Sequence, residues 1–94
     1  MYGKVDRIKD VETVNGKIRG QIRKATTTAR LQELLSRSRY LYTLSFTKAW
    51  KNNFRGKLTS LRKKIKSEYT KTSKLANQRA KTLGIKAFFD IKID

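Results

Sequence analysis

The amino-acid sequence predicts a small two-layer α+β domain of order ββααβ, in which a long antiparallel helical hairpin packs on a small sheet. Two segments, 27–51 and 57–83, carry apolar residues at intervals of three or four, which is typical of helices that bury one face. Residues 85–94 alternate between apolar and polar, which indicates a half-buried strand. An Asn-Gly pair within residues 1–24 favours a β-hairpin, so both ends of the chain would form the sheet.

Residues 1–24 fit two interpretations. In the first, Asn15 and Gly16 form a type I′ turn between two short strands. In the second, the segment is a helix with a heptad apolar face. The positions on that face would be Ile8, Val11, Asn15, Ile18, Ile22, Ala25 and Ala29. Gly16 and Gly20 inside such a helix would each cost about 1 kcal/mol, so the hairpin is favoured.

The segment 27–51 is expected to form the first helix of the hairpin. One of the threonines at 26–28 can cap its first turn, because a hydroxyl accepts a hydrogen bond from an unpaired backbone amide. The polar stretch 52–56 is the expected turn. The apolar face is wide and predicts contact with both the second helix and the sheet. Its members are Leu31, Leu34, Leu35, Leu41, Tyr42, Phe46 and Ala49.

The segment 57–83 predicts the second helix, and Gly84 is well placed to end it in the left-handed conformation that glycine adopts freely. The apolar or small positions of this helix are Leu58, Leu61, Ile65, Tyr69, Thr72, Ala76, Ala80 and Leu83. The strand that follows would bury Ile85, Ala87, Phe89, Ile91 and Ile93 on one face.

The charge of the chain is strongly unbalanced. It has 24 Lys and Arg against 7 Asp and Glu, a formal net charge of +17 on 94 residues. Residues 1–12 and 85–94 are each neutral, so the segment 13–84 carries the whole excess. Because self-repulsion of this size destabilises a compact state, we expect a polyanionic partner, DNA or RNA, that neutralises it. The length fits a single nucleic-acid-binding domain, 1–94.

The candidate phosphate contacts lie on the predicted helical hairpin. Five lysines fall opposite the apolar stripe of the second helix: Lys63, Lys64, Lys71, Lys74 and Lys81. Further candidates are Arg37, Arg39, Tyr40, Lys48, Lys51, Arg55 and Arg62. A charged face is also typical of any exposed helix, but such a face usually intersperses glutamates at i+4, and here Glu68 is alone. The face therefore predicts phosphate binding.

The residue types exclude most catalytic chemistry. The chain has no His and no Cys, which removes the commonest general bases, nucleophiles and zinc ligands. No phosphate-cradling glycine motif is present. If the terminal strands paired, Asp90 and Asp94 would approach Asp6, Asp10 or Glu12 and could hold Mg²⁺. Solvated cross-strand ion pairs explain these acids better, so we expect no enzyme, cofactor or metal.

The sequence therefore predicts a non-enzymatic protein that grips the phosphate backbone with little sequence specificity. A protein-binding module or inhibitor of a nucleic-acid-processing machine is the alternative, and it would depend on Trp50, Phe54 and Tyr40. A ribonucleoprotein structural component and a membrane-surface helix are further possibilities. An exposed strand edge would allow a homodimer. With no signal-peptide core or spanning segment, the expected location is cytoplasmic or nucleoid-associated.

Overall fold

A computed structural model describes residues 5–93, and within this range the protein is helical with no strand. The helices are α1 (Ile8–Ile22), α2 (Thr28–Leu44), α3 (Lys48–Asn53) and α4 (Leu58–Thr82). The predicted α+β class, its sheet and its ββααβ order are therefore wrong. Three long helices replace the predicted two, because the N-terminal segment folds as a helix rather than as a hairpin.

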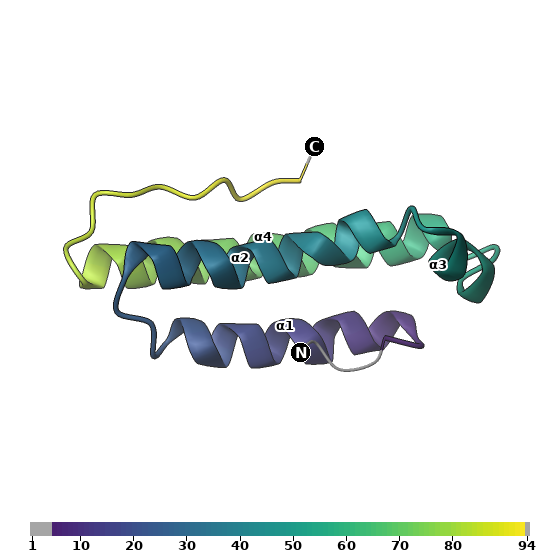
Figure 1. The fold of residues 1–94 in the computed structure, drawn as a ribbon, viewed down its shortest axis with the longest axis horizontal. Coiled ribbons are helices and arrows are strands. Elements are labelled where there is room, and N and C mark those ends of the chain that lie inside the picture. The colour runs from purple at the N-terminus through teal and green to yellow at the C-terminus, as the bar shows by residue number, and fades with distance from the viewer. Residues whose placement is uncertain (1–4, 94) are drawn as a thin grey trace.

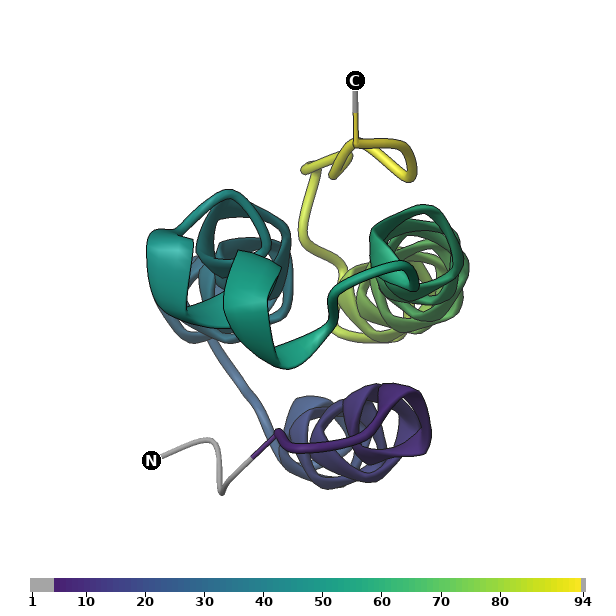
Figure 2. The same cartoon turned by 90° about the vertical axis from the view of Figure 1, so that its right-hand side faces the viewer.

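The three long helices form an antiparallel bundle in which each contacts the other two. α1 and α4 run in one direction and α2 runs in the other, with the short α3 at one end of the bundle (Figure 1). Viewed end-on, α1, α2 and α4 occupy the corners of a triangle (Figure 2). Residues 85–93 double back over α2 and α4, on the side away from α1. The molecule measures 44 × 24 × 17 Å.

The N-terminal hairpin is the first correction. α1 adopts the alternative helical reading, in which Val11, Ile18 and Ile22 are buried. Added Cβ atoms at Gly16 and Gly20 would meet nothing within 4 Å, so these glycines cost helix propensity but create no packing defect. Burying three large apolar side chains at roughly 1.5–3 kcal/mol each outweighs that cost. Tertiary packing therefore overrides the local turn preference of Asn-Gly.

The predicted helix 27–51 is interrupted. Thr27 caps α2 as expected, since its Oγ1 accepts a hydrogen bond from the backbone of Arg30 at 3.2 Å. The chain leaves the helix after Leu44, and α3 begins at Lys48 after three intervening residues, the last of which, Thr47, is its cap. Phe46, predicted to be in the core, falls in this break and is 48% exposed. After this break the chain changes direction, and α3 connects α2 to α4 at the end of the bundle (Figure 1).

α4 ends within one residue of the predicted helix at both termini. Gly84 has φ of 74° and ends it as expected. The backbone amide of Ile85 donates to Ala80 O at 2.9 Å and that of Gly84 donates to Lys81 O at 3.1 Å. This pair of bonds is the Schellman arrangement, and it reverses the chain so that residues 85–93 return along α4.

The C-terminal segment is extended but is not a strand. Its period of two is genuine, because Phe89 is buried against the helices while Phe88 and Asp90 are exposed. The side-chain amide of Asn77 replaces a partner strand: its Oδ1 accepts from Phe89 N at 2.7 Å, and its Nδ2 donates to Phe89 O at 2.9 Å. Thr70 Oγ1 donates to Ile91 O at 2.7 Å. The strand edge predicted for a homodimer is therefore absent from the described residues.

A polar layer crosses the centre of the bundle. Asn15, Ser38 and Thr72, one from each long helix, are all fully buried. The hydroxyls of Ser38 and Thr72 both donate to Asn15 Oδ1, and Asn15 Nδ2 donates to Val11 O at 3.0 Å. Each of these polar groups is satisfied within the core, so the layer fixes the relative register of the three helices.

Replacing Asn15 with leucine is expected to destabilise the protein by about 2 kcal/mol, because the Ser38 hydroxyl loses its acceptor in the core. Combining this change with Ser38→Ala and Thr72→Val removes the other two polar groups of the layer, and Arg19 keeps Glu68 as its acceptor, so stability should return to the wild-type level or above it. Urea unfolding followed by circular dichroism measures both. If Asn15→Leu alone were as stable as the wild type, the hydrogen bonds of this layer would not stabilise the fold.

Candidate nucleic-acid interface

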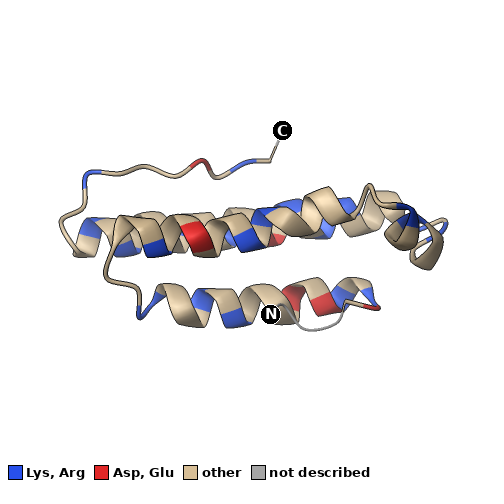
Figure 3. Cartoon of the chain, viewed as in Figure 1, with Lys and Arg blue, Asp and Glu red and all other residues tan. Residues whose placement is uncertain are grey.

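The exposed face of α4 carries no acidic side chain. Its exposed positions are Thr59, Ser60, Lys63, Lys66, Ser67, Lys71, Lys74, Gln78, Lys81 and Thr82. Glu68, the one acid in α4, is fully buried. The face therefore combines ammonium, hydroxyl and amide groups, all of which donate hydrogen bonds. Figure 3 shows the basic residues distributed along the bundle.

The five predicted lysines of this helix divide into two groups. Lys63, Lys74 and Lys81 are exposed and make no ion pair within residues 5–93. Lys71 is 60% exposed and reaches Glu68 Oε2 at 3.2 Å. Lys64 instead turns towards α1, where its Nζ lies 3.2 Å from Glu12 Oε2. Four of the five predicted lysines therefore remain on the open face, and Lys64 belongs to an interhelical ion-pair network.

That network is centred on Glu68. Its Oε1 accepts from Arg19 Nη1 at 3.1 Å, and its Oε2 lies near Lys71 and, at 3.8 Å, near Lys64. Arg19 also donates to Thr72 Oγ1 at 3.2 Å, which joins the network to the polar layer. The buried carboxylate thus neutralises cations of α1 and α4 that would otherwise repel each other.

The predicted residues of α2 are largely engaged within the protein. Arg37 Nη2 lies 2.8 Å from Glu33 Oε1. The hydrogen bond from Arg30, and the charges of Arg30 and Arg37, hold the pKa of Glu33 below its ordinary value. Arg39 stacks over the Tyr69 ring at 5.2 Å and donates to its hydroxyl at 3.3 Å. Tyr40 is 47% exposed, as predicted.

Of the predicted residues in and near α3, three are exposed and one is engaged within the protein. Lys48, Lys51 and Arg55 are exposed. Arg62 holds the break after α2: its Nη2 donates to Ser45 O at 3.0 Å, and its guanidinium lies 4.0 Å from the centre of the Phe46 ring. A role in anchoring this corner explains Arg62 better than phosphate binding.

The aromatic residues proposed as protein-binding anchors are mostly internal. Phe54 is only 2% exposed, and Trp50 packs against it with ring centroids 5.6 Å apart. This pair closes the corner between α3 and α4. Of the three predicted anchors, Tyr40 is the most exposed, at 47%.

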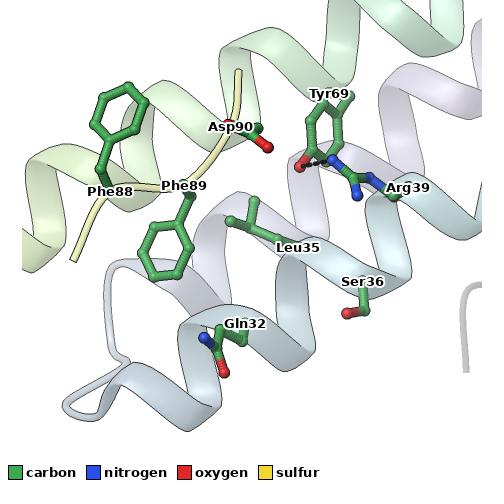
Figure 4. A pocket seen from close by; sticks show the side chains of 8 residues that line it. All are labelled: Gln32, Leu35, Ser36, Arg39, Tyr69, Phe88, Phe89 and Asp90. Atoms are coloured by element: carbon green, nitrogen blue, oxygen red, sulfur yellow. Dashed lines mark hydrogen bonds between the residues drawn. The ribbon is translucent and has the colours of Figure 1, made fainter. Parts of the chain in front are cut away.

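An open pocket of about 400 Å³ lies between α2 and the C-terminal segment (Figure 4). Its lining consists of Gln32, Leu35, Ser36, Arg39, Tyr69, Phe88, Phe89 and Asp90. Figure 4 shows Phe89 directed towards Leu35 and Gln32, while Phe88 points to the other side of the segment. Phe88 was not among the predicted contacts, although the alternation that buries Phe89 implies that Phe88 faces outward.

The magnesium site considered above required the two ends of the chain to pair as strands. Residues 5–93 contain no strand that could pair the two ends, and the segment 85–93, which includes Asp90, lies on the side of the bundle away from α1, which includes Asp10 (Figures 1 and 2). Asp10 accepts hydrogen bonds from the backbone amides of Arg7 and Asp6, which lower the pKa of its carboxyl. Residues 5–93 contain no cluster of three or more potential metal ligands. Asp94 lies outside the described residues.

None of the helices in this range is both long and apolar enough to span a bilayer. Comparison with models of protein families, with curated proteins and with solved structures finds no match for this chain. The function is therefore inferred from the chain's own residues.

Proposed function

We propose that this chain is a non-enzymatic nucleic-acid-binding protein that contacts the phosphate backbone through the exposed face of α4. One observation carries the proposal: the 25-residue helix buries its only acid and exposes lysines, hydroxyls and amides. An ordinary exposed helix intersperses acids with bases, which lowers its attraction for a polyanion. This face has no exposed acid, and Lys63, Lys74 and Lys81 keep their charge uncompensated by any ion pair among the described residues, whereas Lys71 pairs with Glu68.

The spacing of the lysines suits an extended polyanion. Lys63 and Lys81 are separated by about 27 Å along the helix, at 1.5 Å per residue. Lys71 and Lys74 lie between them on the same exposed face. Phosphates of one DNA strand recur every ~3.4 Å along the axis, so the face can neutralise several of them at once. Lysine is a point charge without a fixed hydrogen-bond pattern, so binding should depend little on base sequence.

The cations around α3 extend this surface. Lys48, Lys51 and Arg55 are exposed, and α3 lies at the same end of the bundle as the start of α4 (Figure 1). A nucleic acid lying along α4 would reach them beyond Lys63. Their proposed role is secondary, because they lie on a six-residue helix and a turn rather than on the long helix.

The proposal is tested by titrating the protein against labelled duplex DNA, single-stranded DNA and an RNA hairpin at several salt concentrations. With three to four lysines on phosphates, the slope of log affinity against log salt on duplex DNA should be about −3 to −4. Heparin is the control polyanion, because it carries charge without bases. Equal and weak binding to the three nucleic acids and to heparin would mean that the protein attracts any polyanion without a nucleic-acid interface, and it would overturn the proposal.

A further inference from the structure

We infer that Phe88 is a stacking platform for an unpaired base, so that this chain binds single-stranded nucleic acid, or duplex with unpaired bases, more tightly than intact duplex. This inference rests on the proposed function and specifies the form of nucleic acid. It is carried by three features near the end of α4: an exposed phenylalanine, an adjoining hollow, and lysines at the edge of that hollow.

Phe88 is the most exposed large hydrophobic side chain of the described residues, at 77%. Its position is rigid compared with that of a loop tip, because the next residue is anchored. Phe89 is buried, and both its backbone N–H and its C=O are hydrogen-bonded by Asn77. Phe88 therefore presents an aromatic face at a fixed point of the surface, and folding buries little of it. A ring placed in this way is suited to stacking on a ligand.

A hollow of about 450 Å³ adjoins the ring on the side of α4. Its lining comprises Asn77, Lys81, Ile85, Lys86, Ala87 and Phe88. The volume is within the ~300–1,000 Å³ range of small-molecule sites. Ile85 and Ala87 provide apolar contacts, and the lining contains no acid that would repel a phosphate.

The lysines connect this hollow to the α4 face. Lys81 lines the hollow and also belongs to the exposed row that includes Lys63 and Lys74. Lys86, on the returning segment, supplies a second ammonium close to Phe88. A strand whose phosphates follow α4 therefore arrives at Lys81 with a base within reach of the aromatic ring.

The choice of a single strand follows from the geometry of stacking. In an intact duplex both faces of every internal base are occupied by neighbouring bases, so a surface phenylalanine finds no free face. Unpaired bases expose their faces, and stacking on an aromatic side chain tolerates any base. Phe88 should therefore contribute to single-strand affinity and contribute nothing to duplex affinity.

The test measures the affinity of wild-type protein, Phe88→Ala and Phe88→Trp for a labelled oligothymidylate and for a duplex of equal length. Phe88→Ala should weaken oligothymidylate binding about tenfold, with the salt slope and the duplex affinity unchanged. Phe88→Trp should restore the affinity, and its additional fluorescence should be quenched on binding. Phe46→Ala removes another exposed ring, 48% exposed at the far end of the bundle, and should leave single-strand affinity unchanged.

Wild-type oligothymidylate affinity in Phe88→Ala would overturn the inference and leave the proposed function intact. An equal loss on oligothymidylate and duplex would also overturn it, since that pattern indicates a structural effect. If the wild-type protein bound no nucleic acid, the proposed function and this inference would both fail.

Discussion

Replacing Glu68 with alanine is expected to lower the free energy of unfolding by about 3 kcal/mol, the lower end of the range for breaking a buried ion pair. Glu68 is fully buried and lies within 3.2 Å of both Arg19 and Lys71. Without the carboxylate, the cations of α1 and α4 face each other across the helix contact and a cavity remains. Arg19 and Lys71 are partly exposed and can turn towards water, which limits the loss.

Urea unfolding followed by circular dichroism measures this loss, because urea, unlike guanidinium, does not screen charges. Lys71→Ala is the matched control: it removes the most exposed partner of Glu68 and should cost less than about 1 kcal/mol. Glu68→Gln keeps the shape and should fall between the two. If Glu68→Ala unfolded at the wild-type urea concentration, the ion-pair network would have no structural role.

The second large effect is expected on binding. Replacing Lys63, Lys74 and Lys81 together with alanine should weaken nucleic-acid binding by about a hundredfold or more at ~0.1 M salt, because each lost phosphate contact removes close to a factor of ten. These side chains are exposed and make no ion pair within the described residues, so the fold should not change. Fluorescence anisotropy measures the affinity, and circular dichroism checks the helix content.

The matched control removes the same charge from another helix. Lys9, Lys17 and Lys24 are exposed in and beside α1, and their replacement with alanine lowers the net charge equally. If binding depends on the α4 face, this variant should retain most of its affinity. Equal losses in the two triple variants would show that net charge alone drives binding.

The sequence predicted α4 closely because every local signal agreed. The apolar steps of three or four and the glycine at position 84 pointed to the same helix and the same end. α1 differed because two periodicities coexist in its residues. Asn15 and Gly16 form a strong local turn signal, and only the bundle shows that burying the apolar face of α1 outweighs it.

The C-terminal segment shows a different limit of the sequence. Alternation reveals that one side of an extended segment is buried, but it does not reveal against what. The predicted partner was another strand, whereas Asn77 and Thr70 of α4 supply the hydrogen bonds. These partners are side chains on a helix, and no pattern within residues 85–94 identifies them.

The sequence predicted which residues of the candidate site are exposed, but not which of them are held by partners elsewhere in the chain. The exposed face of α4 follows from helical periodicity alone, and four of the five predicted lysines lie on it. Their contact with phosphate stays a prediction. Glu68 was expected to be an isolated acid on the charged face, and only the contact with α1 buries it. Arg39 and Arg62 are engaged by Tyr69 and Ser45, which are distant in sequence. Such long-range partners cannot be inferred from local spacing.

The dependence of binding on salt tests the α4 interface most directly, because the slope counts neutralised phosphates independently of absolute affinity. On duplex DNA, the slope for the Lys63, Lys74 and Lys81 triple variant should be shallower than the wild-type slope by about 0.9 per lysine, or between two and three in total. The Lys9, Lys17 and Lys24 variant should keep the wild-type slope. Equal slopes for the wild type and the α4 variant would contradict phosphate contact by this face.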